Sequence, residues 1–353
     1  MTGPASSAPG HYQVPAPGTL NVDHVAHFVP HMDAASAALE NLGFTLTPFS
    51  AQSQRAETGG PLVPAGTGNR CVMMQRGYLE ILTPTGDTPV AGQLRAAMQR
   101  YVGAHLIAFG TAAPEADHAR LVQAGFAPLA PVDLQREIGT ADGTDTARFT
   151  LVRVPPGTMP EGRVQFCQHQ TPGLLWQQRW LYHANRAVSL AGVILRVADA
   201  QEAAKRYARY TGLPARPSGS VWRLDTARGY LIFADRDTLH RRLGVVAPTL
   251  PWIGGHILKS DDLGVTGDYL RKVGASVHVL GNHRLLVDLP PAVTIFGIIA
   301  AGILFGLPGV LLATPLTIVV MVLVRRLYLE EDKHEVLASS DAPATPPPPI
   351  TPS

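Results

Sequence analysis

The sequence is poor in cysteine, with Cys71 and Cys167 alone among 353 residues. Disulfide frameworks and thiolate zinc sites need several cysteines at characteristic spacings, so both classes are excluded. We therefore interpret Cys71 and Cys167 as buried structural thiols, which pack as small hydrophobic side chains.

The chain also lacks an excess of either charge. It carries 29 Lys and Arg residues against 27 Asp and Glu residues, a net charge of +2, and the two signs are interspersed. Proteins that bind nucleic acid gather their basic side chains into a patch or stripe. We therefore expect no nucleic-acid partner.

The first residues lack the basic region and the apolar core of a secretory signal. They read MTGPASSAPGHYQVPAPG, which is small, polar and rich in proline. We expect a disordered N-terminus at residues 1–19, followed by a soluble part that faces the cytoplasm.

One long segment lacks charge altogether, since no side chain from Pro290 to Val324 is ionisable. A bilayer core about 30 Å thick is crossed by about 20 apolar residues, so this segment is long enough. Pro308 interrupts it, which leaves a tilted helix, a broken helix and a re-entrant hairpin open. We expect residues 290–327 to form a transmembrane or re-entrant segment that contacts the membrane through residues 292–324.

The end of the chain follows this segment. Arg325 and Arg326 favour a cytoplasmic position directly after it. Residues 328–353 are charged and then rich in proline, and such a composition cannot bury enough apolar surface to order itself. We expect a disordered tail and a protein that is membrane-associated.

Upstream of residue 290, one pattern of strand, helix and three strands recurs four times. Each copy begins with an apolar alternating segment; the copies start near residues 20, 103, 191 and 254. Self-similarity of this kind indicates repeated structural units. The fold class is therefore predicted as α+β, built from four βαβββ units.

The first two units show the expected boundaries most clearly. In the first, Asp33 is predicted to cap the helix and Gly43 to end it, with strands at 45–49, 69–74 and 77–82. In the second, the helix covers 115–123 before Gly125, and the strands lie near 127–137, 146–154 and 163–168.

Three stretches carry a resemblance to a known family. They are VDHVAHFVPHMDAASAALENLGF (22–44), GTGNRCVMMQRGYLEIL (66–82) and FCQHQTPGLLWQQRWLYHANRAVSLAGVILRVAD (166–199). They resemble glyoxalase-like proteins of the vicinal oxygen chelate superfamily, and the resemblance covers residues 20–289. It implies two pseudo-barrels, one from residues 20–172 and one from residues 173–289, with the fourth unit truncated.

The resemblance also implies a divalent metal site, with Fe, Mn, Ni or Zn as the candidate ions. Carried over by position, the metal ligands are His24 in the first strand, Glu80 in the last strand of the first unit and His105 in the second unit. Gln165 is the best-aligned fourth ligand, and His169 is the alternative. Glu80 is also the expected catalytic carboxylate, and the substrate is expected to be a small polar molecule.

Several other residues are expected beside the site. They are Asn69, Arg70, His183 and Asn185, whereas His27 and His31 are interpreted as bystanders. Trp176 and Trp180 are four residues apart and are expected to pack one helix face against the barrel. The third unit has Ile232 where the first has Glu80, so no second metal centre is predicted.

Three functions remain open at this point. The first is a metal-dependent lyase, isomerase or dioxygenase tethered to a membrane, and the second is a metal-free module that binds or sequesters a small molecule. Residues 290–332 contain ILFGLPGVLLATPL (303–316) and VLVRRLY (322–328), and through these motifs they resemble the C-terminal end of autoinducer-2 exporter-like permeases. The third function is therefore a transport-associated remnant without transport activity. A homodimer is one expected assembly.

Overall fold

The structure is a computed structural model that describes residues 13–55, 60–235, 238, 247–280 and 284–288. The chain divides into two compact units, Met1–Leu289 and Pro290–Ser353. The predicted membrane segment at residues 290–327 and the tail at residues 328–353 lie outside the described residues. None of the helices in the described ranges is long and apolar enough to cross a membrane.

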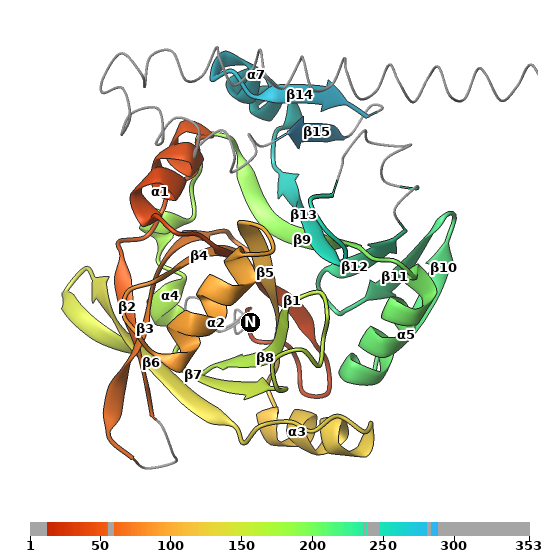
Figure 1. Ribbon diagram of the computed structural model, residues 1–353. Helices are drawn as coiled ribbons and strands as arrows, with labels where there is room; N and C mark the ends of the chain where they lie inside the picture. Colours follow the sequence, from red (N-terminus) through yellow and green to blue (C-terminus); the bar gives the residue numbers. More distant parts are fainter. Residues whose placement is uncertain (1–12, 56–59, 236–237, 239–246, 281–283, 289–353) are drawn as a thin grey trace, which may run out of the picture. The chain divides into compact units, whose positions relative to one another are not determined.

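The first two predicted units form the barrel. The first unit consists of β1 (Asn21–Phe28), α1 (Met32–Asn41), β2 (Ser50–Arg55), β3 (Leu62–Met73) and β4 (Tyr78–Pro84). Helix α2 (Pro89–Met98) leads to the second unit, which consists of β5 (Gly103–Gly110), α3 (Pro114–Gln123), β6 (Val132–Thr140), β7 (Gly143–Arg153) and β8 (Arg163–His169). Their strands close in the order β1-β4-β3-β2-β6-β7-β8-β5 (Figure 1).

The two units are related by the way their strands pair. In each unit the last strand pairs in parallel with the first, β4 with β1 and β8 with β5. The two first strands, β1 and β5, then pair with each other in antiparallel fashion. The barrel wall therefore has the continuous strand sequence β4, β1, β5, β8.

Helix α1 ends where the sequence predicts it. Gly43 has φ +85°, a conformation that costs glycine little, and a Cβ there would lie 2.9 Å from the backbone nitrogen of Asn185. The predicted start is wrong, because His31 occupies the N-cap position and Asp33 lies in the first turn. The strand predicted at 45–49 is also displaced, since β2 begins at Ser50.

The second half does not repeat the barrel within the described residues. It contains β9 (Ala187–Arg196), α5 (Ala200–Thr211), β10 (Ala215–Ser218), β11 (Val221–Asp225), β12 (Tyr230–Ala234), β13 (Trp252–Ser260), α7 (Leu263–Lys272), β14 (Ser276–Val279) and β15 (Leu285–Asp288). One sheet has the order β10-β11-β12-β9-β13, and β14 and β15 form a separate hairpin.

The prediction of a second pseudo-barrel over residues 173–289 is therefore wrong for the part of the chain that the structure describes. Strand β12 closes the third unit by pairing in parallel with β9, as β4 does with β1. Among the described residues, no strand takes the corresponding place beside β13. The last two described strands of the fourth unit, β14 and β15, pair with each other instead.

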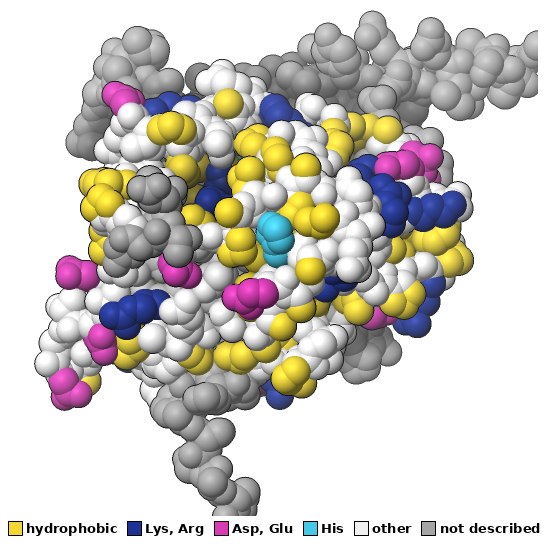
Figure 2. Space-filling view, turned by 90° about the horizontal axis from the view of Figure 1, so that it is seen from below, with side chains coloured by type: hydrophobic (Ala, Val, Ile, Leu, Met, Phe, Trp, Pro, Cys, Tyr) yellow, Lys and Arg dark blue, Asp and Glu magenta, His cyan; other side chains and the backbone are white. Residues whose placement is uncertain are grey.

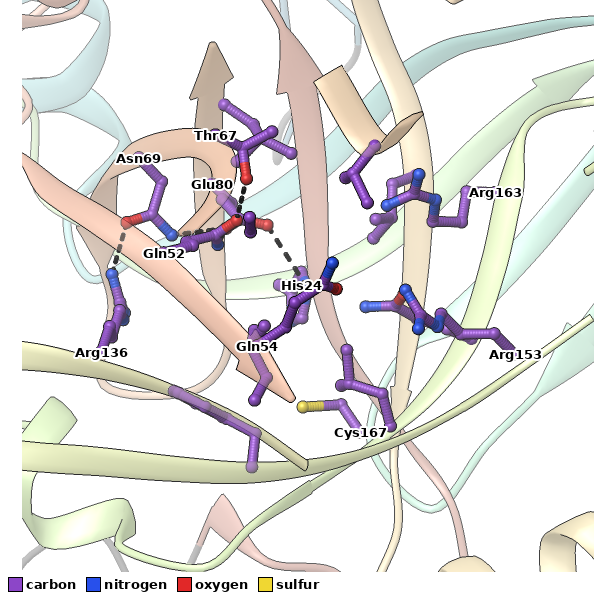
Figure 3. A pocket seen from close by; sticks show the side chains of 18 of the residues that line it. His24, Gln52, Gln54, Thr67, Asn69, Glu80, Arg136, Arg153, Arg163 and Cys167 are labelled. Atoms are coloured by element: carbon purple, nitrogen blue, oxygen red, sulfur yellow. Dashed lines mark hydrogen bonds and ion pairs between the residues drawn. The ribbon is translucent and has the colours of Figure 1, made fainter. Parts of the chain in front are cut away.

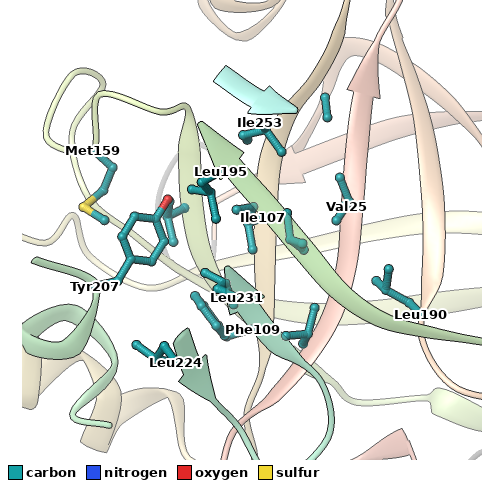
Figure 4. Close-up of a cluster of buried hydrophobic side chains, with 14 of the residues drawn as sticks. Val25, Ile107, Phe109, Met159, Leu190, Leu195, Tyr207, Leu224, Leu231 and Ile253 are labelled. Carbon is teal, nitrogen blue, oxygen red and sulfur yellow. The ribbon is translucent and has the colours of Figure 1, made fainter. Parts of the chain in front are cut away.

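Two hydrophobic clusters stabilise this arrangement. One lies between the outer face of the barrel and the second sheet, and it joins Val25 and Ile107 to Leu195, Tyr207 and Leu231 (Figure 4). The other lies inside the barrel, and its main members are Ala26, Phe28, Leu82, Leu106, Ala108, Phe149, Leu151 and Trp176. Because successive side chains of a strand point to opposite faces, β1 and β5 contribute to both clusters.

Candidate active site

The barrel encloses a pocket that contains three of the four predicted metal ligands. The cavity volume is about 60 Å³. Its walls are formed by His24, Gln52, Gln54, Ala65, Thr67, Asn69, Tyr78, Glu80, Leu82, Val90, Leu106, Leu134, Arg136, Phe149, Leu151, Arg153, Arg163, Gln165 and Cys167. His24, Glu80 and Gln165 thus line the same space. Figure 3 shows His24 and Glu80 side by side in it.

His24 and Glu80 approach each other inside the barrel. His24 lies on β1 and is 3% exposed, and Glu80 lies on β4 and is 7% exposed. The Nε2 atom of His24 is 3.7 Å from the Oε2 atom of Glu80. The ring of His24 stacks on Tyr78, with 4.4 Å between the ring centroids.

Asp23 holds His24 from behind. Its Oδ2 atom is 2.7 Å from Nδ1 of His24 and 2.9 Å from Nε2 of His169. The pairing of β1 with β5 shifts by one residue between Val22 and His24, so Asp23 is the extra residue of a β-bulge. A bulge changes the direction of the side chains beside it, so the side chain of Asp23 can contact that of His24, the next residue.

The electrostatics of Asp23 follow from these contacts. Burial alone would raise the pKa of this carboxyl, because the side chain has no contact with solvent. The attraction and hydrogen bonds of His169 and His24 outweigh burial and hold the pKa well below its ordinary value. Asp23 is therefore a carboxylate that accepts hydrogen bonds from two imidazoles, which places a proton on Nδ1 of His24 and leaves Nε2 toward Glu80.

Glu80 is also held by neighbouring side chains. Its Oε1 atom accepts hydrogen bonds from Asn69 and from Nε2 of Gln52, the latter at 3.2 Å. Thr67 donates to Oε1 of Gln52 at 2.7 Å and so fixes the amide. The other carboxylate oxygen, Oε2, remains directed at His24.

His105 does not join this group. It is 1% exposed, its Nε2 atom is 2.6 Å from the carbonyl oxygen of Tyr101, and it does not line the pocket. Burial lowers its pKa to about 4. The structure therefore separates His105 from His24 and Glu80, contrary to the ligand set expected from the resemblance.

The strand register explains the position of His105. Glu80 pairs with Ala26, two residues after His24, and Gln165 pairs with Ala108, two residues after Leu106. Leu106 is thus the structural equivalent of His24, and it lines the pocket. A shift of one residue moves a side chain to the opposite face of a strand.

Gln165 and His169 take different places. Gln165 lines the pocket, and its buried Oε1 atom has no hydrogen-bond partner among the described residues. His169 does not line the pocket, and its ring lies between Phe149 and Trp176 with its Nε2 atom on Asp23. Of the two alternatives, Gln165 is the residue that lines the pocket.

Of the residues expected beside the site, Asn69 lies at the pocket and the other three lie elsewhere. Asn69 contacts Glu80, whereas Arg70 points away from the barrel and donates from Nε to the carbonyl of Thr47 at 2.8 Å. His183 and Asn185 hold the connector after the barrel in place. Nε2 of His183 is 2.9 Å from the carbonyl oxygen of Met73, and Nδ2 of Asn185 donates to the carbonyl oxygen of Leu42 at 2.8 Å.

The connector also holds a buried tryptophan. Trp176 donates from Nε1 to the carbonyl of Met74 at 3.1 Å and is 1% exposed. The single helix expected to carry Trp176 and Trp180 is absent, because α4 (Pro172–Leu175) and the short 3₁₀ helix Gln178–Trp180 are separate. Trp176 alone therefore provides the deep contact.

A second group of buried ligand atoms lies next to the pocket. Atoms of Asp23, Cys167 and His169 all lie within 4.8 Å of one another. Burial raises the pKa of the Cys167 thiol well above its ordinary value, and Oδ2 of Asp23 is already shared by two imidazoles. This group is the alternative place for a metal ion, besides the pair formed by His24 and Glu80.

Several residues of the site were not predicted from the sequence. Asp23 was overlooked because a bulge leaves no recognisable signal in the sequence. Arg163 could have been found, since it precedes Gln165 by two residues in a predicted strand and so shares its face. Arg136 and Arg153 come from other strands, and the sequence gives no sign that they converge on the same pocket.

Comparison with known proteins identifies the family. Residues 22–211 match the family described as glyoxalase-like domain. The chain belongs to the glyoxalase-like domain family. The match includes the whole barrel and extends through α5, and no curated protein matches the chain. The comparisons give no support to the permease resemblance of residues 290–332.

Three solved structures are similar to parts of this glyoxalase-like chain at low sequence identity. A hypothetical protein from Staphylococcus aureus is 15% identical over 61% of this chain and 86% of that chain, with a TM-score of 0.48. A triple mutant of 4-hydroxymandelate synthase from Streptomyces coelicolor is 16% identical over 73% and 76%, with a TM-score of 0.43. Methylmalonyl-CoA epimerase in complex with methylmalonyl-CoA and NH4+ is 20% identical over 44% and 98%, with a TM-score of 0.29. These similarities are too distant to carry a functional argument.

Proposed function

We propose that this glyoxalase-like protein is a divalent-metal-dependent enzyme that converts a small polar substrate inside the barrel. The observation that carries the proposal is the pair formed by His24 and Glu80. Their Nε2 and Oε2 atoms are 3.7 Å apart at the pocket, and each side chain is fixed from behind by other polar groups. Such fixed pairs of imidazole and carboxylate are typical of metal sites.

The residues present fit a divalent cation. Asp23 accepts from Nδ1 of His24 and so favours the tautomer whose Nε2 can bind a metal. Gln165 brings a buried oxygen without a partner among the described residues, which would be a third donor. Nitrogen and oxygen donors of this kind suit Fe, Mn, Ni or Zn.

The chemistry of the site follows from these groups. A bound divalent cation would supply Lewis-acid polarisation of a substrate oxygen. Glu80 is placed to accept or return a proton at Oε2, while Gln52 and Asn69 hold its other oxygen. Leucine and phenylalanine side chains line the pocket beside these polar groups.

Metal analysis of the purified full chain tests the proposal. We expect about one divalent ion per chain in the wild type, and loss of that ion in His24→Ala and in Glu80→Ala, because each removes one of the two strong ligands. The exposed His31→Ala variant is the matched control and should keep the ion.

Further variants separate the two groups of ligand atoms. If the ion is lost from Cys167→Ser and His169→Ala but kept in Glu80→Ala, the metal belongs to the group of Asp23, Cys167 and His169, and the assignment to Glu80 is wrong. Circular dichroism of each variant shows whether the fold is intact. A correctly folded wild type that takes up no divalent ion overturns the proposal.

A second candidate is a metal-free module that binds a small molecule. The observation that favours it is Leu106, which occupies the structural position equivalent to His24 and offers no ligand atom. The same metal analysis decides between the two candidates, since this module would show an intact fold and no uptake of metal.

A further inference from the structure

The pocket carries an uneven charge. Three guanidinium groups line it, those of Arg136, Arg153 and Arg163, against the single carboxylate of Glu80. On the face of the molecule seen in Figure 2, basic and acidic side chains both occur. The lining of the pocket therefore carries more positive than negative side chains.

Arg136 is held by neighbouring side chains within the protein. It donates to the Oδ1 atom of Asn69, whose amide in turn donates to Glu80. Its guanidinium also lies over the ring of Phe149, 5.8 Å from the centroid. Burial would lower its pKa, yet the neighbouring acidic groups, Glu80 among them, raise it. Arg136 thus holds Asn69, which in turn holds Glu80. The role of Arg153 and Arg163 in the pocket is a separate question.

The other two arginines differ from Arg136 in their partners. Within the described part of the chain, none of the three arginines forms an ion pair, but Arg136 contacts three side chains, whereas the guanidinium of Arg153 makes no hydrogen bond. Arg163 donates from its terminal nitrogen to Oε1 of Gln93 on α2 at 2.8 Å, which fixes the side chain without neutralising it. Burial lowers the pKa of both, and for Arg163 the charge of Arg153 adds to this effect and brings the pKa to about 10.

The strand register brings the two arginines to one wall. Arg153 at the end of β7 pairs with Gln165, and Arg163 at the start of β8 precedes Gln165 by two residues. Figure 3 shows both guanidinium groups pointing into the pocket from the side away from Glu80. Glu80 and Arg163 lie on one cross-strand row, with Ala26 and Leu106 between them.

We propose that Arg153 and Arg163 form an oxyanion subsite that binds a carboxylate or phosphate group of the substrate. The inference rests on the proposed function and narrows its substrate class to small anionic molecules. Guanidinium groups bind such oxyanions through paired hydrogen bonds, and they do so most strongly where water is excluded. An anion held there would direct the rest of the molecule along the wall toward His24 and Glu80.

The test uses the full chain after treatment with a chelator, so that no metal contributes. Inorganic phosphate and oxalate are titrated separately into the protein and followed by calorimetry. We expect saturable binding of at least one of them, weakened about tenfold or more in Arg153→Gln and in Arg163→Gln, because each loses a charged hydrogen-bond donor. The stronger of the two anions tells whether a phosphate or a carboxylate fits better.

Matched variants keep the test specific. Arg148 lies on the same strand, β7, is exposed and does not line the pocket. The Arg148→Gln variant should therefore bind the anions as the wild type does. Should Arg153→Gln fail to fold, Arg153→Lys retains the charge without the planar fork and should bind with reduced affinity. Absence of binding to the wild type, wild-type binding by both pocket variants, or an equal loss in Arg148→Gln would overturn the subsite.

The outcome is distinguishable from that of the proposed function. A chain that takes up no metal but binds anions through the two arginines contradicts the metal-dependent enzyme and supports the subsite. A chain that takes up metal through His24 and Glu80, without anion binding in the chelated form, does the reverse.

Discussion

At the scale of single residues, Asp23 decides how His24 can act. Its Oδ2 atom is shared by Nδ1 of His24 and Nε2 of His169, at 2.7 and 2.9 Å. A carboxylate in this position fixes both the tautomer and the ring orientation of a metal-binding histidine. Asp23 is therefore the residue through which the tertiary structure prepares the proposed ligand pair.

Asp23→Asn tests this role. The amide cannot accept both hydrogen bonds in the same way, so metal affinity is expected to fall about 10- to 100-fold while the pocket keeps its ligands. Calorimetric titration with Zn²⁺ or Mn²⁺ measures the affinity, and nitrogen NMR of His24 reports the change of tautomer.

Asp33→Asn is the matched control, since Asp33 is an exposed acid in the first turn of α1. It should bind metal as the wild type does. Unchanged metal affinity and an unchanged tautomer in Asp23→Asn would contradict the role assigned to Asp23.

At the scale of elements, three histidines mark the seam where β1, β5 and β13 meet outside the pocket. His27 and His256 lie edge to face, 5.3 Å between centroids, and His105 stacks on Tyr101. Burial, the largest cause in each case, lowers their pKa values to about 3 for His27 and about 4 for His105 and His256. The folded state therefore keeps these imidazoles neutral.

This seam should make stability dependent on pH. An unfolded histidine titrates near pH 6.5, so below that pH the unfolded chain binds more protons and stability falls as the pH is lowered toward about 3 to 4. Each such histidine contributes up to about 1.4 kcal/mol per pH unit to the loss. Asp23 changes the stability only at lower pH. Its depressed pKa stabilises the fold at pH values above 3.8, the ordinary pKa of this carboxyl, and this contribution is lost as the pH falls further.

Urea unfolding at pH 7 and pH 5 measures the effect. The difference between the two free energies of unfolding should shrink in His256→Gln and stay unchanged in the exposed His31→Gln control. Equal stability of the wild type at both pH values would show that these histidines are not kept neutral by the fold.

The boundaries of the helices and strands show which features the local sequence can predict. Gly43 and Gly125 end helices α1 and α3 as predicted, because a left-handed residue is a local requirement that the sequence meets with glycine. The N-cap of α1 and the start of β2 were misplaced, since both depend on how the chain enters the barrel. Elements were thus predictable in type and order, and less so at their ends.

At the scale of the whole molecule, the glyoxalase-like part and residues 290–353 form separate compact units. The absence of charge from Pro290 to Val324 is a property of the sequence, and association with a membrane remains a prediction from it. The orientation toward the cytoplasm and the homodimer likewise remain predictions.

Cell fractionation tests the membrane prediction. The full chain is expected in the membrane fraction and to resist extraction by high salt and by carbonate, because apolar contact is insensitive to ionic strength. A full-length chain that carries both Ile298→Asp and Val310→Asp should be released, since charges within an apolar segment oppose its insertion. A wild-type chain found in the soluble fraction contradicts the prediction.

The sequence by itself determined the repeating βαβββ units, the positions of His24 and Glu80 in the first of them and the placing of Gln165 as the equivalent of Glu80. The units are recorded in local patterns of apolar alternation and glycine, whereas the three residues were placed through the family resemblance. The tertiary structure decided that Leu106 and not His105 matches His24, that Asp23 reaches His24, and that Arg153 and Arg163 meet in one pocket. These outcomes depend on hydrogen-bond register between strands far apart in the sequence, where a shift of one residue exchanges the inner and outer faces, so no local pattern could record them.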